Sequence, residues 1–155
     1  TIQNYDPLES LKKRLANMEF TDTEATVKRR REQQILADIL FLDKTEESCS
    51  ICHKVMPTEL LHAAHIKQRS ECTKKEKTDP NIVMPLCKLG CDDLFEQGFI
   101  LINSKGRIKK NSNTLISKDL DLHLESLVEL ECTSFNKNTA PYFKHRYASN
   151  SKNNT

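Results

Sequence analysis

The sequence predicts an α+β fold with N-terminal helices, a strand–loop–strand–helix core, a basic hairpin and a C-terminal helical segment. Up to about Leu42, apolar residues recur at helical spacing, whereas short apolar runs alternate with polar loops beyond it. Two close cysteine pairs bracket the predicted core, and four thiolates brought together can hold one zinc ion. The core is therefore predicted to be stapled by zinc.

The composition is that of a globular protein, with 37% hydrophobic and 30% charged residues. No apolar run approaches membrane-spanning length and no signal peptide is visible, so we expect no membrane partner. Paired cysteines without secretory features favour metal binding in a reducing compartment, which predicts a cytoplasmic protein. Because Thr1 is not an initiator methionine, we expect a processed, tagged or truncated chain, and in the last case further domains would belong to the longer protein. We divide the present chain into segments 1–45, 46–112 and 113–155.

Two helices are expected in the N-terminal segment. The first covers residues 4–19, with Asp6 as its N-cap and Pro7 in its first turn. The second begins near Thr21–Thr23 and ends at about Leu42. The buried side of this second helix is predicted to consist of Val27, Ile35, Leu36, Ile39 and Leu40.

The middle segment is predicted to contain the core. Its apolar runs suit two strands, Leu60–Ile66 and Ile82–Leu86, joined by the polar, lysine-rich loop Lys67–Pro80. A short helix, Cys91–Gln97, follows, and Gly98 is a natural helix terminator. The core is therefore expected to run as strand, loop, strand and helix.

A basic hairpin and a helical piece are expected to complete the fold. Phe99–Lys110 has the pattern of a hairpin, while Asp119–Glu131 mixes helical and strand periodicity and stays open between the two. A disordered polar tail is expected from about residue 149. The aromatic residues expected to pack a terminal helix onto the body are Tyr142, Phe143 and Tyr147.

The cysteine spacing predicts a structural zinc site. Cys49 and Cys52 form a CxxC knuckle, and Cys87 and Cys91 form a slightly wider one. Four sulfur ligands complete a tetrahedron around zinc and leave no open position for a substrate. Two free thiol pairs or disulfides are the alternatives. The remaining cysteines are expected to be free thiols: Cys72 and Cys132.

Polar residues within the loop that zinc would close suit phosphodiester hydrolysis. A neutral imidazole at His65 can accept a proton from water. Asp92 and Glu96, one helical turn apart, offer hard oxygen ligands to Mg(II) or Mn(II), and Asn81 can hold the loop or the histidine. Each residue also has a structural interpretation, as a satisfied strand histidine, helix-start acids and a turn-forming asparagine.

The segments LLHAAHI, DPNIVMPLC and CDDLFEQGFILINSKGRI together resemble the HNH endonucleases, also called ββα-metal or His-Me finger nucleases, in the branch with a four-cysteine zinc knuckle. The resemblance covers about Lys28 to Arg107. It implies that His65 is the general base that activates water, that Asn81 supports the site, and that Asp92 binds the catalytic divalent ion. Glu96 falls at the acidic position of the LFDxGxI pattern that is usual in this family.

Two positions depart from the family pattern. Asp92 stands where histidine is the commoner choice, and Ala64 precedes His65 where many relatives have a metal-binding aspartate or histidine. His62 could compensate, although on an alternating strand it need not face the site. A noncatalytic zinc module that binds nucleic acid or protein is therefore the alternative function.

The resemblance implies a metal-dependent DNA endonuclease, with structural Zn(II), catalytic Mg(II) or Mn(II), and restriction or phage defence as its setting. One active site cuts one strand, so double-strand cleavage would require a homodimer or two successive nicks. Basic residues of the loop and the hairpin are expected to contact the DNA backbone. They are Lys67, Arg69, Lys74, Lys75, Arg107, Lys109 and Lys110.

Overall fold

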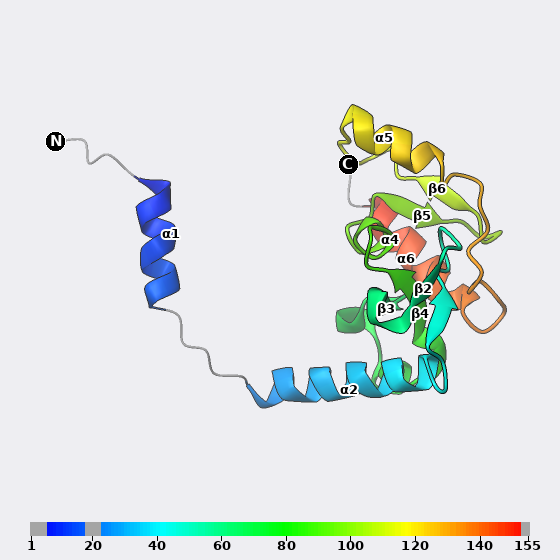
Figure 1. Ribbon diagram of the computed structural model, residues 1–155, viewed down its shortest axis with the longest axis horizontal. Helices are drawn as coiled ribbons and strands as arrows, with labels where there is room; N and C mark the ends of the chain where they lie inside the picture. Colours follow the sequence, from blue (N-terminus) through cyan, green and yellow to red (C-terminus); the bar gives the residue numbers. More distant parts are fainter. Residues whose placement is uncertain (1–5, 18–22, 153–155) are drawn as a thin grey trace. The chain divides into compact units, whose positions relative to one another are not determined.

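The computed structural model describes residues 6–17 and 23–152, and its helices and small antiparallel sheets form an α+β fold (Figure 1). The chain divides into two compact units, Thr1–Arg30 and Arg31–Thr155. The second unit includes both the predicted core and the predicted C-terminal segment, which therefore fold together.

Helix α1, Pro7–Ala16, has the predicted N-cap and first turn but begins after residue 4, where the prediction began it. The Asp6 carboxylate accepts hydrogen bonds from the backbone N–H groups of Leu8 and Glu9, and Pro7 occupies the first turn. The ends of the predicted helix, residues 4–5 and 18–19, lie outside the described residues. The helix has an exposed apolar stripe: Leu8, Leu11 and Leu15.

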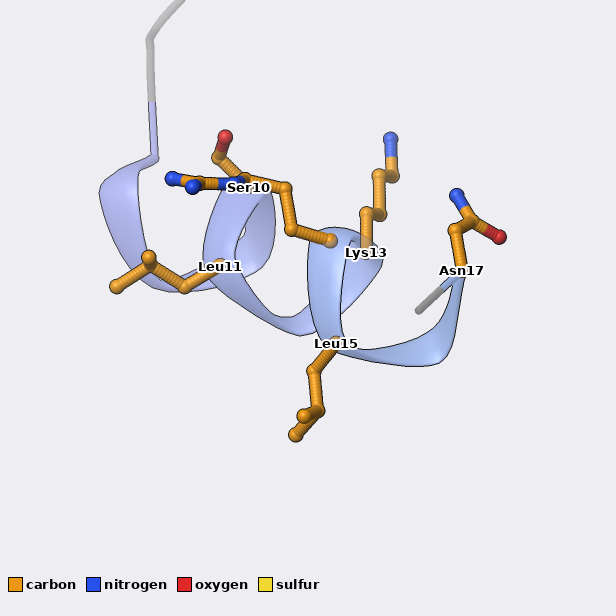
Figure 2. A pocket seen from close by; sticks show the side chains of 6 residues that line it. Ser10, Leu11, Lys13, Leu15 and Asn17 are labelled. Carbon is orange, nitrogen blue, oxygen red and sulfur yellow. The ribbon is translucent and has the colours of Figure 1, made fainter. Parts of the chain in front are cut away.

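A shallow hollow beside α1 is lined only by side chains of that segment, as Figure 2 shows. Leu11 and Leu15 point to one side of the helix, whereas Ser10, Lys13 and Asn17 point elsewhere (Figure 2). Because every described lining residue belongs to this one segment, the hollow is a surface feature of one helix.

Helix α2, Glu24–Leu40, corrects the predicted buried side of this segment. Leu36 is buried and Leu40 is half-buried, but Val27, Ile35 and Ile39 are exposed. The predicted apolar face is therefore wrong for these three residues.

Polar side chains account for the orientation of the C-terminal half of α2. The side-chain amide of Gln33 donates to the backbone carbonyl of Ala63 at 2.7 Å, and Glu32 forms a two-point ion pair with Arg69. A buried backbone carbonyl needs a donor. The helix therefore presents Glu32, Gln33 and Leu36 to the rest of the unit, and the hydrophobic pattern alone misplaces that face.

The core has the predicted strand–loop–strand–helix order. Strand β3, Leu61–His65, pairs antiparallel with β4, Val83–Cys87, and α4, Cys91–Glu96, packs against both strands. The register places His65 opposite Val83. Gly98 has a φ of 77° directly after this helix, as expected of a helix terminator.

The predicted polar loop between β3 and β4 contains short helices. These are η2, Arg69–Glu71, α3, Lys74–Lys77, and η3, Pro80–Ile82. A capping box begins α3, since the Thr73 hydroxyl and the Glu76 carboxylate each accept from the other residue's backbone N–H. Local side-chain bonds therefore give this loop a defined path.

Two further hairpins flank the core. Strand β1, Glu46–Ser48, pairs with β2, Val55–Pro57, and η1, Thr58–Leu60, leads into β3. The second hairpin confirms the prediction, with β5, Ile100–Ile102, antiparallel to β6, Ile108–Lys110.

The C-terminal part of the chain is helical. Helix α5, Lys118–Glu125, begins at an N-cap hydroxyl of Ser117 and resolves the first part of the ambiguous stretch as helix. At the end of that stretch, Glu131 forms an isolated antiparallel bridge with Arg107. Helix α6, Ala140–Lys152, extends into the region where a disordered tail was predicted. Phe143 is buried in the main core, as expected, whereas Tyr147 is 40% exposed.

Gly106 and Gly98 allow one test of the packing. Their φ angles are 78° and 77°, so alanine carries the same left-handed strain at both, about 1–2 kcal/mol. At Gly106 a Cβ would also lie 2.9 Å from the Phe135 ring, whereas at Gly98 its nearest neighbour is Asn150 at 3.5 Å. We predict that Gly106→Ala lowers the free energy of unfolding more than Gly98→Ala does, as measured by urea denaturation. Equal losses would contradict the described packing of Phe135.

Candidate functional site

Four cysteine side chains meet at one place in the C-terminal unit. The sulfur atoms of Cys49, Cys52, Cys87 and Cys91 all lie within 4.8 Å of one another, and those of Cys52 and Cys87 are 3.9 Å apart. Tetrahedral Zn–S bonds of about 2.3 Å imply sulfur separations of about 3.8 Å. The four cysteines can therefore hold a metal ion such as zinc.

The sulfur atoms come from three separate elements. The first knuckle forms the turn of the β1–β2 hairpin, Cys87 ends β4, and Cys91 begins α4. The backbone N–H of Cys87 donates to the sulfur of Cys49 at 3.4 Å, and the N–H of Ser50 donates to the carbonyl of Pro85. The backbone thus holds the two knuckles together independently of any ion.

The thiol protonation states match a cation site. A hydrogen bond from Cys91 is the main cause that lowers the pKa of Cys49 to about 4. The same hydrogen bond, together with burial and the charge of the neighbouring sulfurs, raises the pKa of Cys91. Charge on one sulfur thus opposes charge on the next. A bound cation removes this opposition by neutralising all four thiolates.

The other cysteines and the neighbouring histidine lie outside this cluster. Cys72 and Cys132 are buried free thiols, as predicted, and burial raises the pKa of Cys132 to about 11. The Nε2 atom of His53 is 2.6 Å from the carbonyl oxygen of Glu131 and is therefore engaged elsewhere. The candidate metal ligands are the four cysteines alone.

A second candidate site is a hollow of about 400 Å³ at the end of β3. We call it the histidine hollow. Both histidines of β3 line it, so His62 contributes to this site despite its alternate position on the strand. Its lining residues are His62, His65, Gln68, Arg69, Ser70 and Glu96.

The environment of His65 favours its neutral imidazole. Burial lowers the pKa of His65, and the nearby Arg69 and His62 act in the same direction, although Glu32 and Glu96 oppose them. Its Nε2 atom is buried and has no hydrogen-bond partner among the described residues. His65 is therefore suited to accept a proton near neutral pH.

The two predicted metal ligands among the three acids of α4 have different surroundings. Asp92 is half-buried, and burial raises its pKa, while the neighbouring His62 lowers it. Glu96 lines the histidine hollow and accepts a hydrogen bond from Arg146 at 3.1 Å. His62 acts electrostatically on both Asp92 and His65, so it lies near both. Asp92 itself is not among the residues that line the hollow.

Asn81 holds the loop exit. Its backbone N–H and side-chain amide both donate to the carboxylate of Asp79, which also accepts from the Tyr142 hydroxyl. Among the described residues, no hydrogen bond joins Asn81 to His65. The sequence predicts that Asn81 holds either the loop or His65, and the structure shows it holding the loop.

Arg146 joins the site from α6. It is 3% exposed, its guanidinium lies 4.8 Å over the Phe95 ring, and its Nη2 donates to Glu96. Its Nε and Nη1 atoms have no partners within the described part of the chain. The segment PYFKHR is only a weak sequence signal for this residue, because nothing local shows that the arginine is buried.

Most of the predicted DNA-contacting residues are in ion pairs. Five of the seven pair with carboxylates, and only Lys74 and Lys75, exposed on α3, make no ion pair within residues 6–17 and 23–152. The pairs are Lys67–Glu76, Arg69–Glu32, Arg107–Glu131, Lys109–Glu129, and Lys110 with Asp121 and Glu125.

Among the described residues, the four cysteines form the only group of three or more side chains placed to ligate one metal ion. Asp92 and Glu96 do not form a further group with the histidines. No helix in the described ranges is long and apolar enough to span a membrane. Comparisons with protein-family models and with curated proteins give no match for this chain.

We predict that His65 titrates below its ordinary value of about 6.5. The fold then favours the neutral ring, so its contribution to stability is present above pH 6.5 and is lost as the pH falls through its folded pKa. Histidine-selective NMR at a series of pH values measures this midpoint, and the His65→Gln spectrum assigns the resonance. A midpoint at or above 6.5 would contradict the described burial.

Proposed function

We propose that this protein is a metal-dependent DNA endonuclease of the HNH type, with a structural zinc ion on its four cysteines. One observation carries the proposal: a partly buried histidine at the end of β3 faces a hollow that it shares with an acid of α4, in ββα order. The cysteine cluster supports it, because it joins β4 and the β1–β2 hairpin to that helix.

The structural role of zinc rests on the chemistry of the donor set. Four buried or half-buried thiolates suit zinc and saturate its coordination, so the ion holds elements together and takes no part in catalysis. With Cys87 at the end of β4 and Cys91 at the start of α4, zinc fixes the direction of that helix relative to the strands. It thereby positions Asp92 and Glu96.

In the proposed mechanism, His65 accepts a proton from the water that attacks the phosphodiester. The lowered pKa keeps its imidazole neutral before the reaction. Glu32 and Glu96 favour the imidazolium that forms when the proton is transferred. Glu32 is itself held by Arg69, so α2 and the loop after β3 together set the electrostatics at the base.

Asp92 is the proposed ligand of a catalytic Mg(II) or Mn(II). Magnesium is commonly bound through one or two carboxylates together with substrate phosphates, so a single aspartate fits this pattern. Burial raises the pKa of Asp92, a cost that a cation would offset, whereas Glu96 already bonds Arg146. When bound, the ion supplies charge neutralisation at the phosphate and at the leaving 3′ oxygen.

The neighbouring side chains position this machinery. Arg146 holds Glu96 and stacks on Phe95, which fixes the end of α4. Asn81 and Tyr142 converge on Asp79 and hold the loop exit. Of the predicted backbone contacts, Lys74 and Lys75 on α3 are the best placed, because no carboxylate of the described residues competes for them.

A noncatalytic zinc module is the second candidate function. It is favoured by Ala64, which offers no metal ligand beside His65, and by the ion pairs that engage five of the seven predicted DNA contacts. This candidate shares the zinc site with the nuclease and differs from it in having no hydrolytic activity.

The zinc proposal predicts one bound zinc ion per chain. Cys91→Ala removes a ligand, so we expect loss of the metal and a lower melting temperature. Cys132→Ala is the matched control, because Cys132 is as buried as Cys91, at 3% exposure, but lies outside the cluster. Elemental analysis and thermal unfolding measure both effects. A metal-free wild-type protein whose melting temperature is unchanged by a chelator would rule zinc out.

The nuclease proposal predicts nicking of supercoiled plasmid when Mg(II) or Mn(II) is added. Removing a general base costs about 10²–10⁴ in rate, so we expect His65→Ala to slow nicking at least a hundredfold. His123→Ala is the control, since His123 is an exposed histidine on α5 outside the hollow. Gel electrophoresis of relaxed and supercoiled DNA gives the rates.

Two outcomes separate the candidate functions. If wild-type protein and His65→Ala leave plasmid equally intact while both retain zinc, the nuclease proposal fails and the noncatalytic module stands. If both variants nick equally fast, His65 is not the base and the cleavage belongs elsewhere or to a contaminant. Retained zinc in each preparation shows that loss of activity is not loss of fold.

A further inference from the structure

A second concave surface of the C-terminal unit lies outside the proposed active site. It is a groove of about 690 Å³ between the β5–β6 turn and α6, and we call it the α6 groove. Phe135, Ala140 and Pro141 supply apolar surface, together with Ile102 from β5. Its volume falls within the usual range of ligand sites, about 300–1,000 Å³.

The charged residues that line the α6 groove are all positive. Lys137 and Lys144 line it, and neither forms an ion pair within the described part of the chain. None of the described lining residues is acidic. This differs from the predicted basic loop and hairpin, where carboxylates engage most of the cations. The groove therefore combines apolar surface with two cations available to an anionic ligand.

The aromatic surface of the groove is preorganised. Phe135 packs against Phe143 of the core with ring centroids 5.5 Å apart, and Gly106 of the hairpin turn lies against its ring. Tyr147, one turn after Lys144 on α6, is 40% exposed, a large fraction for an aromatic ring beside a groove. One ring is thus fixed in the wall and another is available to a ligand.

Helix α6 connects the groove with the histidine hollow. Lys144 and Tyr147 lie on one side of the helix, while His145 and Arg146 lie on the other and contact Glu71 and Glu96. A helix with its side chains is about 10 Å across. A strand that reaches the hollow could therefore cross to the groove within a few nucleotides.

We propose that the α6 groove binds unpaired nucleotides of a nucleic-acid strand, with a base stacked on Tyr147 and phosphates beside Lys137 and Lys144. Exposed aromatic rings beside unpaired cations are the usual means of binding single strands. In a duplex the base faces are covered by their neighbours, so only the phosphates could use this surface. The proposal rests on the proposed nuclease function for its link to cleavage, and it names substrates with a single-stranded stretch.

An acidic peptide with an aromatic residue is the competing occupant. The peptide would bind the same two lysines, but a groove built for a peptide would not bind a normal oligonucleotide more tightly than an abasic one. Continuity with the histidine hollow across α6 favours the nucleic acid, because the same strand can serve both sites. Binding of such a peptide is therefore also measured in the test.

The test measures binding by fluorescence anisotropy of a labelled single-stranded oligonucleotide, in the His65→Ala background so that cleavage does not interfere. We expect single strand to bind more tightly than duplex of the same length. Tyr147→Ala should weaken binding of the single strand roughly tenfold, but should leave an abasic oligonucleotide unaffected. Replacing Lys137 and Lys144 with glutamine should reduce the salt dependence by about 0.7 per lysine in log–log slope.

Two control variants lie on α5. Leu122→Ala removes an exposed apolar side chain, and Lys118→Gln removes an exposed cation; neither lines the groove, and both should bind like the parent protein. The proposal is overturned if Tyr147→Ala binds the single strand as well as the parent does, or weakens the abasic strand equally. It is also overturned if an acidic aromatic peptide binds with dependence on Tyr147 while the oligonucleotide does not.

The failure of this proposal is distinguishable from failure of the proposed nuclease. If plasmid is not cut but the oligonucleotide binds with the expected dependence on Tyr147, the groove stands and the nuclease proposal falls. If plasmid is cut with dependence on His65 but Tyr147→Ala changes no binding, the nuclease stands and the groove proposal falls.

Discussion

The meeting of four cysteine sulfurs is the constraint on which the rest of the C-terminal unit depends. Cys52 and Cys87 lie 35 positions apart, and the chain between them carries β3, its loop and β4. Closing such a loop costs conformational entropy, which a metal–thiolate site can offset more readily than a few apolar contacts in a small unit. The cluster thereby ties the end of β4 to the start of α4. The histidine hollow is lined by α4 and by β3, which pairs with β4.

Helix α6 is the second element that shapes this region. Its side chains reach three separate parts of the site: Tyr142 bonds Asp79 at the loop exit, His145 bonds Glu71, and Arg146 bonds Glu96 of α4. The pair of His145 with Glu71 is solvent-exposed and contributes little to stability. Arg146 differs because it is buried, so losing Glu96 would leave its guanidinium uncompensated. The C-terminal segment is therefore part of the candidate site.

Ion pairing decides which cations of this chain are available to a phosphate backbone. The hairpin cations Arg107, Lys109 and Lys110 contact acids of the C-terminal segment, and these contacts raise the pKa of Lys110 through Asp121 and Glu125. A phosphate backbone would have to compete with these carboxylates. Among the described residues, the lysines without an ion pair include Lys74 and Lys75 on α3 and Lys137 and Lys144 along the α6 groove. The proposed nucleic-acid path is therefore expected to include those two places.

Local signals in the sequence determined much of this structure. The Asp6 cap, the hairpin of residues 99–110 and the cysteine spacing were all predictable, because each depends on neighbours a few positions apart. The order of the core elements was predictable for the same reason. The resemblance to HNH nucleases also rests on such local motifs, and the role of His65 that it implies stays a prediction.

Only the tertiary structure decided which residues meet. It turned Glu32 and Gln33 of α2 toward the core, brought His62 to the same hollow as His65, and buried Arg146 beside Glu96. Each of these outcomes joins elements far apart in the sequence, so hydrophobic periodicity carries no information about it. The physical reason is that a buried polar group takes its partner from whatever the fold places beside it, and local sequence specifies the group but not the partner.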